Sequence, residues 1–305
     1  MRLNILGSLT VEGPRGIVPI SAARESALLA ELVAHLGQPV TREHLAEGIW
    51  SGRVRHPAHA VHALVSRLRH RLSLACTEVA GAVIVTRGAC YALHVADDAV
   101  DGLRFQALVL AARQAVATGA YHRGSGLYDD ALELWQGPAL SGAAGDSPCV
   151  QAERSRLEEL RVTVLEERAQ ALLRVGAHRA LVTELLPLVD AYPLREGLRA
   201  ALMLALYRSG RVGEALAAYR AAREHLVEHV GVGPGAELRH LHARMLSGDL
   251  RDERESPPHA VELADRPAES LGRLIGELRM DQARLETRIR RLEARLAGRP
   301  RSASG

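Results

Sequence analysis

Several kinds of residue are missing or scarce in this 305-residue chain. It contains no lysine, so all 39 basic residues are arginine, and aromatic residues make up only 3% of it. Hydrophobic residues still reach 47%, so its cores must be built from leucine, valine and alanine, which suits helices. The most informative gap lies between Glu47 and Glu78, because this stretch has five arginines and no acidic residue.

Cysteine and long apolar runs are also scarce. Only Cys76, Cys90 and Cys149 are present, without a C-x-x-C pair, which excludes a disulfide framework and the usual zinc modules. No apolar run approaches the roughly 18 residues of a membrane span. The segment MRLNILGSL lacks the apolar core and cleavage site of a signal peptide. We therefore expect a cytoplasmic protein without a membrane partner.

The common catalytic signatures are absent as well. The sequence has no phosphate loop, GxGxxG, HExxH or GxSxG motif. His56, His59 and His62 recur at a spacing that can bind metal, but no cysteine or carboxylate beside them completes a site. We expect a protein that is not an enzyme and that has no cofactor and no metal site.

The net charge of +3 is unevenly distributed along the chain. Residues 1–96 carry 10 Arg against 6 Asp and Glu, residues 97–250 carry 17 against 20, and residues 251–305 carry 12 against 10. The excess of positive charge at the N-terminal end is typical of a nucleic-acid-binding module. The length predicts two or three domains.

The acid-free stretch contains an amphipathic helix from about residue 58. Its apolar stripe is formed by Val61, Leu64, Val65, Leu68 and Leu72. The opposite face presents small and hydrogen-bonding side chains, which we predict to contact DNA base edges: His59, Ala63, Ser66, Arg67 and His70. A DNA major groove accepts such a helix, although a solvated arginine face on an ordinary helix is the alternative.

The segments around this helix predict a winged helix-turn-helix. Apolar residues alternate over 2–20 around the turn at 13–16, which predicts a small antiparallel sheet. Two helices are expected next, one over 22–36 capped by Ser21 and one from the Thr41 cap to Trp50. Pro57 suits the first turn of the third helix, and two strands over 79–86 and 89–95 form the wing. We predict phosphate contacts from Arg55, Arg69, Arg71, Thr86 and Arg87.

Residues 97–250 are predicted to be nearly all helical and contain an internal repeat. LLRVGAHRAL at 172–181 recurs as LYRSGRVGEAL at 206–216, with Gly176 and Gly210 in register 34 residues apart. A 34-residue period of paired helices is the tetratricopeptide signature.

These motifs resemble a known family. LNILGSLTV, LLAELVAHLGQPVTREHLAEGIW, SRLRHRL and IVTRGACYAL are similar to the OmpR-type winged helix of the Streptomyces antibiotic regulatory proteins (SARPs). ALELWQGPAL, ERSRLEELR, PLREGLRAALMLALYRSGR and HVGVGPGAEL resemble the bacterial transcriptional activator domain that follows it. Two departures are Arg24-Glu25-Ser26, where the family has a basic-Pro-basic triplet, and Cys90 in place of the glycine before the wing tyrosine.

The resemblance implies an activator of a secondary-metabolite (antibiotic) gene cluster. Such proteins bind double-stranded DNA at tandem direct repeats upstream of promoters and recruit RNA polymerase holoenzyme. The resemblance also implies a polymerase-facing loop between the second and third helices, formed by Ser51, Arg53, Val54 and Arg55. The same loop has two other interpretations, a plain connection and a phosphate contact.

The C-terminal region has a heptad pattern. After a polar, proline-bearing linker at 251–269, leucines recur every seven residues, and a second apolar series with one glutamine follows four residues after each. This pattern favours a parallel two-stranded coiled coil and a homodimer on DNA, while a helix packing back on its own domain is the alternative. The dimerisation residues are Leu271, Ile275, Leu278, Gln282, Leu285, Ile289, Leu292 and Leu296.

We therefore predict a mainly α protein in five segments. Residues 1–96 form an α+β winged helix-turn-helix, and residues 97–250 form an all-α, tetratricopeptide-like activator domain. Residues 251–269 are a linker, residues 270–297 a leucine-zipper-like coiled-coil helix, and residues 298–305 a disordered tail. The predicted function is sequence-specific transcriptional activation. The alternative is a scaffold or small-molecule sensor that does not bind DNA directly.

Overall fold

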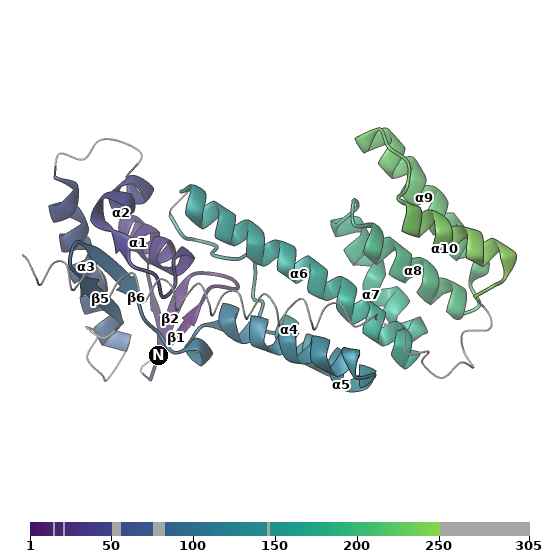
Figure 1. The fold of residues 1–305 in the computed structure, drawn as a ribbon, viewed down its shortest axis with the longest axis horizontal. Helices are drawn as coiled ribbons and strands as arrows, with labels where there is room; N and C mark the ends of the chain where they lie inside the picture. Colours follow the sequence, from purple (N-terminus) through teal and green to yellow (C-terminus); the bar gives the residue numbers. More distant parts are fainter. Residues whose placement is uncertain (15, 21, 51–55, 76–82, 145–146, 251–305) are drawn as a thin grey trace, which may run out of the picture. The chain divides into compact units, whose positions relative to one another are not determined.

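The computed structural model describes residues 1–14, 16–20, 22–50, 56–75, 83–144 and 147–250 (Figure 1). The predicted loop at 51–55, the linker, the heptad segment and the tail lie outside these residues. Helices dominate the described part, and the strands are confined to its first hundred residues, as the sequence predicts. Among the described helices, none has both the length and the apolar character needed to cross a bilayer.

A three-stranded antiparallel sheet opens the fold. Its strands, in the order β1-β2-β3, are β1 (Arg2–Asn4), β2 (Thr10–Gly13) and β3 (Gly16–Pro19). Gly13 pairs with Gly16 across the predicted turn, and Gly16 has a φ of 104°, which favours glycine. The alternating apolar residues Leu3 and Val11 pair with one another and face the core.

Three helices follow: α1 (Ala23–Ala34), α2 (Arg42–Ile49) and α3 (Pro57–Ala75). The side chain of Thr41 accepts the His44 N–H at 3.2 Å, which confirms the predicted cap of the second helix. Helix α1 begins at Ala23, one residue later than predicted, and its N-cap is Ala22, which makes no side-chain cap hydrogen bond, instead of the predicted Ser21.

A second sheet forms the wing. The order is β4-β6-β5, with β4 (Val40–Thr41), β5 (Ile84–Arg87) and β6 (Cys90–Leu93). The strand β6 lies within the predicted range 89–95 but is shorter, whereas β5 extends one residue past the predicted end at 86, to Arg87. The two-residue strand β4 carries too little sequence for a period-two pattern, and the sequence analysis missed it.

The next helices are α4 (Asp101–Ala117), α5 (Tyr121–Leu132) and α6 (Pro148–Val175), preceded by a 3₁₀ turn at Asp97–Ala99. They share one hydrophobic core with the winged helix, because Leu3, Leu28, Phe105 and Leu157 belong to the same buried cluster. The core therefore continues across residues 96 and 97, where the sequence suggested a domain boundary.

A buried carboxylate joins the first sheet to α4. Asp101 accepts the backbone N–H groups of Ile5 at 2.8 Å, Leu6 at 3.0 Å and Gly102 at 2.8 Å. Burial raises the pKa of Asp101, while these three N–H donors act in the opposite direction. The carboxylate thus satisfies backbone groups that would otherwise be buried without an acceptor.

The segment after α5 continues this connection. The carbonyls of Leu6, Ile5 and Gly7 accept backbone N–H groups from residues 136, 140 and 141 at 2.8–2.9 Å. The Arg154 guanidinium of α6 donates in turn to the carbonyls of residues 139 and 140. The first sheet, this segment and α6 are therefore held together by a continuous set of hydrogen bonds.

The remaining helices build the predicted repeat: α7 (His178–Ala191), α8 (Glu196–Arg208), α9 (Val212–Val230) and α10 (Ala236–Ser247). Gly176 follows α6 with a φ of 91°, and Gly210 follows α8 with a φ of 84°. Both positions require the left-handed conformation that glycine adopts without strain, which explains the 34-residue register.

Replacing Asp101 with alanine should leave three buried N–H groups without their acceptor. We expect the free energy of unfolding to fall by about 3 kcal/mol, within the range for losing charge-assisted bonds to buried donors. Urea denaturation followed by circular dichroism measures this loss. Asp98→Ala, which replaces an exposed aspartate three residues earlier, is the matched control and should change stability by less than about 0.5 kcal/mol. Equal effects of the two substitutions would contradict the role of Asp101.

Candidate nucleic-acid interface

Helix α3 has one buried face and one exposed face. Val61, Leu64, Val65, Leu68 and Leu72 are each at most 1% exposed, as the apolar stripe predicts. The five predicted base-edge residues are all exposed on the same helix: His59, Ala63, Ser66, Arg67 and His70. The face therefore presents imidazole, hydroxyl and guanidinium groups around a small residue, with no acidic side chain on the helix itself.

A buried glutamate on α1 holds two of the arginines. The Glu25 carboxylate is 6% exposed and lies 2.6 Å from Arg71 Nε and 3.5 Å from Arg67 Nε. The Arg67 side chain remains 60% exposed, whereas that of Arg71 is 33% exposed. Arg71 therefore fastens α3 to α1, and Arg67 retains donors that face solvent.

Arg69 connects α3 to the wing. Its Nε donates to the Ile84 carbonyl at 3.0 Å, its Nη2 donates to the same carbonyl, and Nη2 also donates to Thr86 Oγ1 at 2.9 Å. Arg69 and Thr86, which were both predicted to contact phosphates, are therefore hydrogen-bonded to one another.

Tyr91 lies at the centre of this junction and is fully buried. Its hydroxyl is 3.0 Å from His62 Nδ1, and the guanidinium groups of Arg42 and Arg69 lie over its ring at 5.6 Å and 5.8 Å. The ring thereby fixes α2, α3 and β6 against one another through cation–π contacts.

A tight turn between β5 and β6 forms the tip of the wing. Gly88 has a φ of 60°, and Arg87 pairs with Cys90 at the ends of the two strands. Arg87 and Thr86 are exposed there. Arg42 donates from Nη2 to the Gly88 carbonyl at 3.3 Å, so the helix α2 also holds the turn. Arg87 is therefore the cation at the wing tip, where the sequence placed it.

The sequence analysis missed the positioning residues Glu25, Arg42 and Tyr91. In the sequence, the only signal for these positions was that Glu25 and Cys90, the residue before Tyr91, depart from the SARP pattern. Glu25, at the proline position of the basic-Pro-basic triplet, is the carboxylate that pairs with Arg67 and Arg71. The remaining predicted phosphate contact, Arg55, and the predicted polymerase-facing loop lie outside the described residues.

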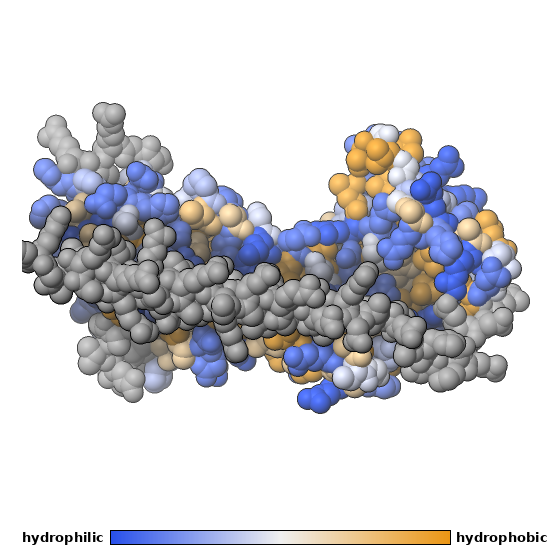
Figure 2. All heavy atoms as spheres, viewed as in Figure 1, coloured by the Kyte–Doolittle hydropathy of each residue, from blue (hydrophilic) through white to orange (hydrophobic). Residues whose placement is uncertain are grey.

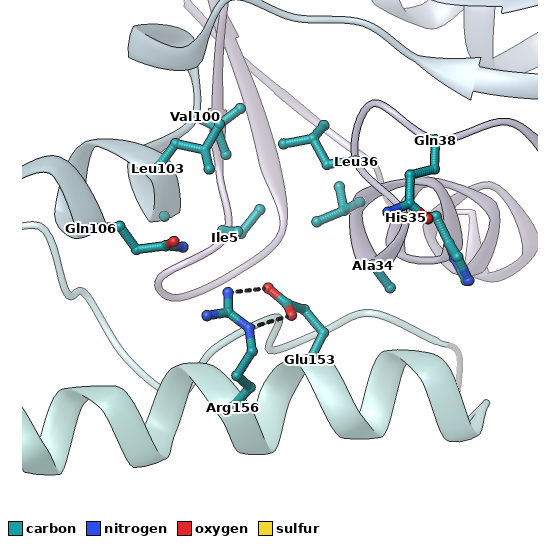
Figure 3. Close-up of a pocket in the computed structure, with 12 residues that line it drawn as sticks. Ile5, Ala34, His35, Leu36, Gln38, Val100, Leu103, Gln106, Glu153 and Arg156 are labelled. Atoms are coloured by element: carbon teal, nitrogen blue, oxygen red, sulfur yellow. Dashed lines mark hydrogen bonds and ion pairs between the residues drawn. The ribbon is translucent and has the colours of Figure 1, made fainter. Parts of the chain in front are cut away.

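A pocket lies between the winged helix and α6 (Figure 3). Its volume is about 200 Å³, and Glu153 and Arg156 reach into it from α6 as an ion pair with an Nε–Oε2 distance of 2.8 Å. Ile5, Leu36 and Leu103 line the opposite side. Typical small-molecule sites hold about 300–1,000 Å³, so this pocket is smaller than such a site.

Known proteins share both halves of this architecture. The family model described as "Transcriptional regulatory protein, C terminal" matches residues 20–93, and that of the "Bacterial transcriptional activator domain" matches residues 100–246. Regulatory protein AfsR of Streptomyces coelicolor is 37% identical over 251 residues, which cover 82% of this chain. The chain spans only 24% of AfsR.

Two further relatives match along most of this chain. Regulatory protein DnrI of Streptomyces peucetius is 32% identical over 273 residues, which cover 87% of this chain and 99% of DnrI. The solved structure of Mycobacterium tuberculosis EmbR in complex with a low affinity phosphopeptide superimposes with a TM-score of 0.77 at 30% identity. That match covers 81% of this chain and 65% of the EmbR chain.

The wing junction gives a stability prediction. Arg69→Ala removes the donors to Ile84 and Thr86 and should lower the free energy of unfolding by about 1–3 kcal/mol. Arg87→Ala in the same wing removes an exposed side chain and should have an effect below about 0.5 kcal/mol. Thermal and urea unfolding of the two variants checks this difference, and an Arg69→Ala protein as stable as Arg87→Ala would refute it.

Proposed function

Because the chain belongs to the Streptomyces antibiotic regulatory protein family of transcriptional regulators, we propose that it is a sequence-specific DNA-binding activator. It binds tandem direct repeats upstream of promoters in a secondary-metabolite gene cluster and recruits RNA polymerase holoenzyme. The exposed face of α3 carries this proposal. Its five exposed residues lie on one face of the helix and combine hydrogen-bonding side chains with the small side chain of Ala63, which a major groove can accept.

In this proposal, some residues contact DNA and others hold α3 and the wing in position. His59, Ala63, Ser66, Arg67 and His70 face the base edges in the major groove, and Arg87 reaches the backbone or the minor groove from the wing tip. Arg69, Arg71 and Thr86 hold α3 and the wing in place, because the hydrogen bonds of these side chains are directed to the protein.

The helical repeat supplies the surface for protein partners. Val227, Val230 and Val232 at the end of α9 are each about half exposed, at 49%, 49% and 56%. Figure 2 shows hydrophobic side chains gathered over α9 on the face in view. Such a patch is typical of a protein contact. We assign the polymerase contact to this surface and to the loop at Ser51, Arg53, Val54 and Arg55, and the dimer contact to the heptad segment.

The salt dependence of DNA binding tests the arginine assignments. Each lost phosphate contact should reduce the slope of log affinity against log salt by about 0.9. We expect this reduction for Arg87→Ala and no change for Arg220→Ala, an exposed arginine on α9. Fluorescence anisotropy between 50 and 200 mM salt on the cluster's promoter DNA measures both. An unchanged slope for Arg87→Ala would remove this residue from the interface.

Footprinting tests the function as a whole. Purified full-length protein and protein cut after residue 250 are compared on the promoters of the neighbouring gene cluster, with and without RNA polymerase. We expect spaced direct repeats to be protected, the protection to extend when polymerase is added, and cooperativity to fall in the cut protein. Absence of protection at all salt concentrations would favour the scaffold alternative.

A further inference from the structure

Three metal-ligating side chains from separate elements meet beside the winged helix. His35 follows α1, His44 lies in the first turn of α2, and Cys149 lies in the first turn of α6. Their donor atoms all lie within 4.8 Å of one another, and the Cys149 Sγ is 3.8 Å from His44 Nε2. We propose that these residues form a binding site for a tetrahedral transition-metal ion of the zinc type.

The distance between the Cys149 and His44 donor atoms suits such an ion. Zinc binds imidazole nitrogen at about 2.0–2.1 Å and thiolate sulfur at about 2.3 Å, so ligands at a tetrahedral angle lie about 3.6 Å apart. The measured Sγ–Nε2 distance of 3.8 Å is close to this value. The imidazole rings of His35 and His44 are 5.3 Å apart between centroids and inclined at 85°, so they do not stack face to face.

A backbone carbonyl fixes the orientation of one imidazole. His35 Nδ1 is 2.9 Å from the Glu31 carbonyl oxygen, which can only accept a hydrogen bond. Nδ1 therefore carries the proton and Nε2 carries the lone pair that binds a metal. A histidine whose other nitrogen donates to a backbone carbonyl is the common arrangement at metal sites, because the bond sets both the tautomer and the ring orientation.

The donor set selects the class of ion. Two imidazoles and one thiolate favour zinc and similar transition metals over magnesium or calcium, which prefer oxygen ligands. Three protein ligands leave a fourth position for water, a small anion or another side chain. Figure 3 shows that His35 lies at the end of α1, beside the pocket between α1 and α6.

The spacing along the sequence explains why the motif escapes a sequence search. His35 and His44 are nine residues apart, and Cys149 follows 105 residues after His44. The fold brings them together because α1 packs on both α2 and α6. A bound ion would join the two histidines of the winged helix to the helix that carries the activator region, independently of whether the chain binds DNA.

Cobalt titration of the full, untagged chain under metal-free reducing conditions tests the site. We expect one Co²⁺ per chain with a thiolate-to-cobalt charge-transfer absorption, and displacement of Co²⁺ by Zn²⁺ but not by Mg²⁺. Cys149→Ser should abolish the charge-transfer absorption. Cys149→Ser and His44→Gln should each weaken metal binding by more than about 100-fold, since even an outer-shell partner contributes 10–100-fold.

Cys90→Ser is the matched control, because Cys90 is a half-buried free cysteine in β6 outside the cluster. This variant should bind cobalt like the unmodified chain. Circular dichroism without metal shows that each variant is folded, and His44→Gln remains informative if Cys149→Ser is not. No saturable binding by the reduced chain, or undiminished binding by a folded Cys149→Ser or His44→Gln variant, would overturn the proposal.

Discussion

The winged helix depends on a buried acceptor that it does not itself contain. The loop after β1 turns its N–H groups inward, and those of Ile5 and Leu6 find their acceptor in Asp101, about a hundred residues later. An N–H group buried without an acceptor is costly, so the first sheet is complete only when α4 is in place. The carbonyls of the same loop then accept from residues 136–141, which α6 holds. The winged helix and the helices α4–α6 are therefore parts of one folded unit.

The arginines of α3 show how position decides the use of the same side chain. Arg67, Arg69 and Arg71 lie within five residues, yet only Arg67 keeps most of its guanidinium in solvent. Arg71 meets a buried carboxylate, and Arg69 satisfies a strand carbonyl and lies over a tyrosine ring. Arginines of this kind hold α3 in place against α1 and the wing. The sequence alone cannot distinguish these roles, because the groups that each arginine contacts come from distant parts of the chain.

Local patterns predicted most of the fold. The period of Val61, Leu64 and Leu68 gave the recognition helix, the Thr41 cap gave the start of α2, and the register of Gly176 and Gly210 gave the helical repeat. Contacts between distant segments were beyond reach, since Glu25 with Arg71, Tyr91 with His62 and Asp101 with Ile5 carry no spacing signal. The exposure of the five predicted reading residues followed from helical geometry alone, whereas the supporting residues required the tertiary structure.

The long helix α6 has a consequence for how such proteins can be recombined. Val164 and Ala171 belong to the core shared with the winged helix, while Ala169 and Leu173 on the same turns belong to the core of the repeat helices. The two cores therefore overlap along α6, and no linker separates them there. A chimaera that exchanges the winged helix between relatives must carry α4, α5 and α6 along with it, because a junction at residue 96 would separate the first sheet from Asp101. The packed unit in this architecture is therefore larger than residues 20–93, which the first family model matches.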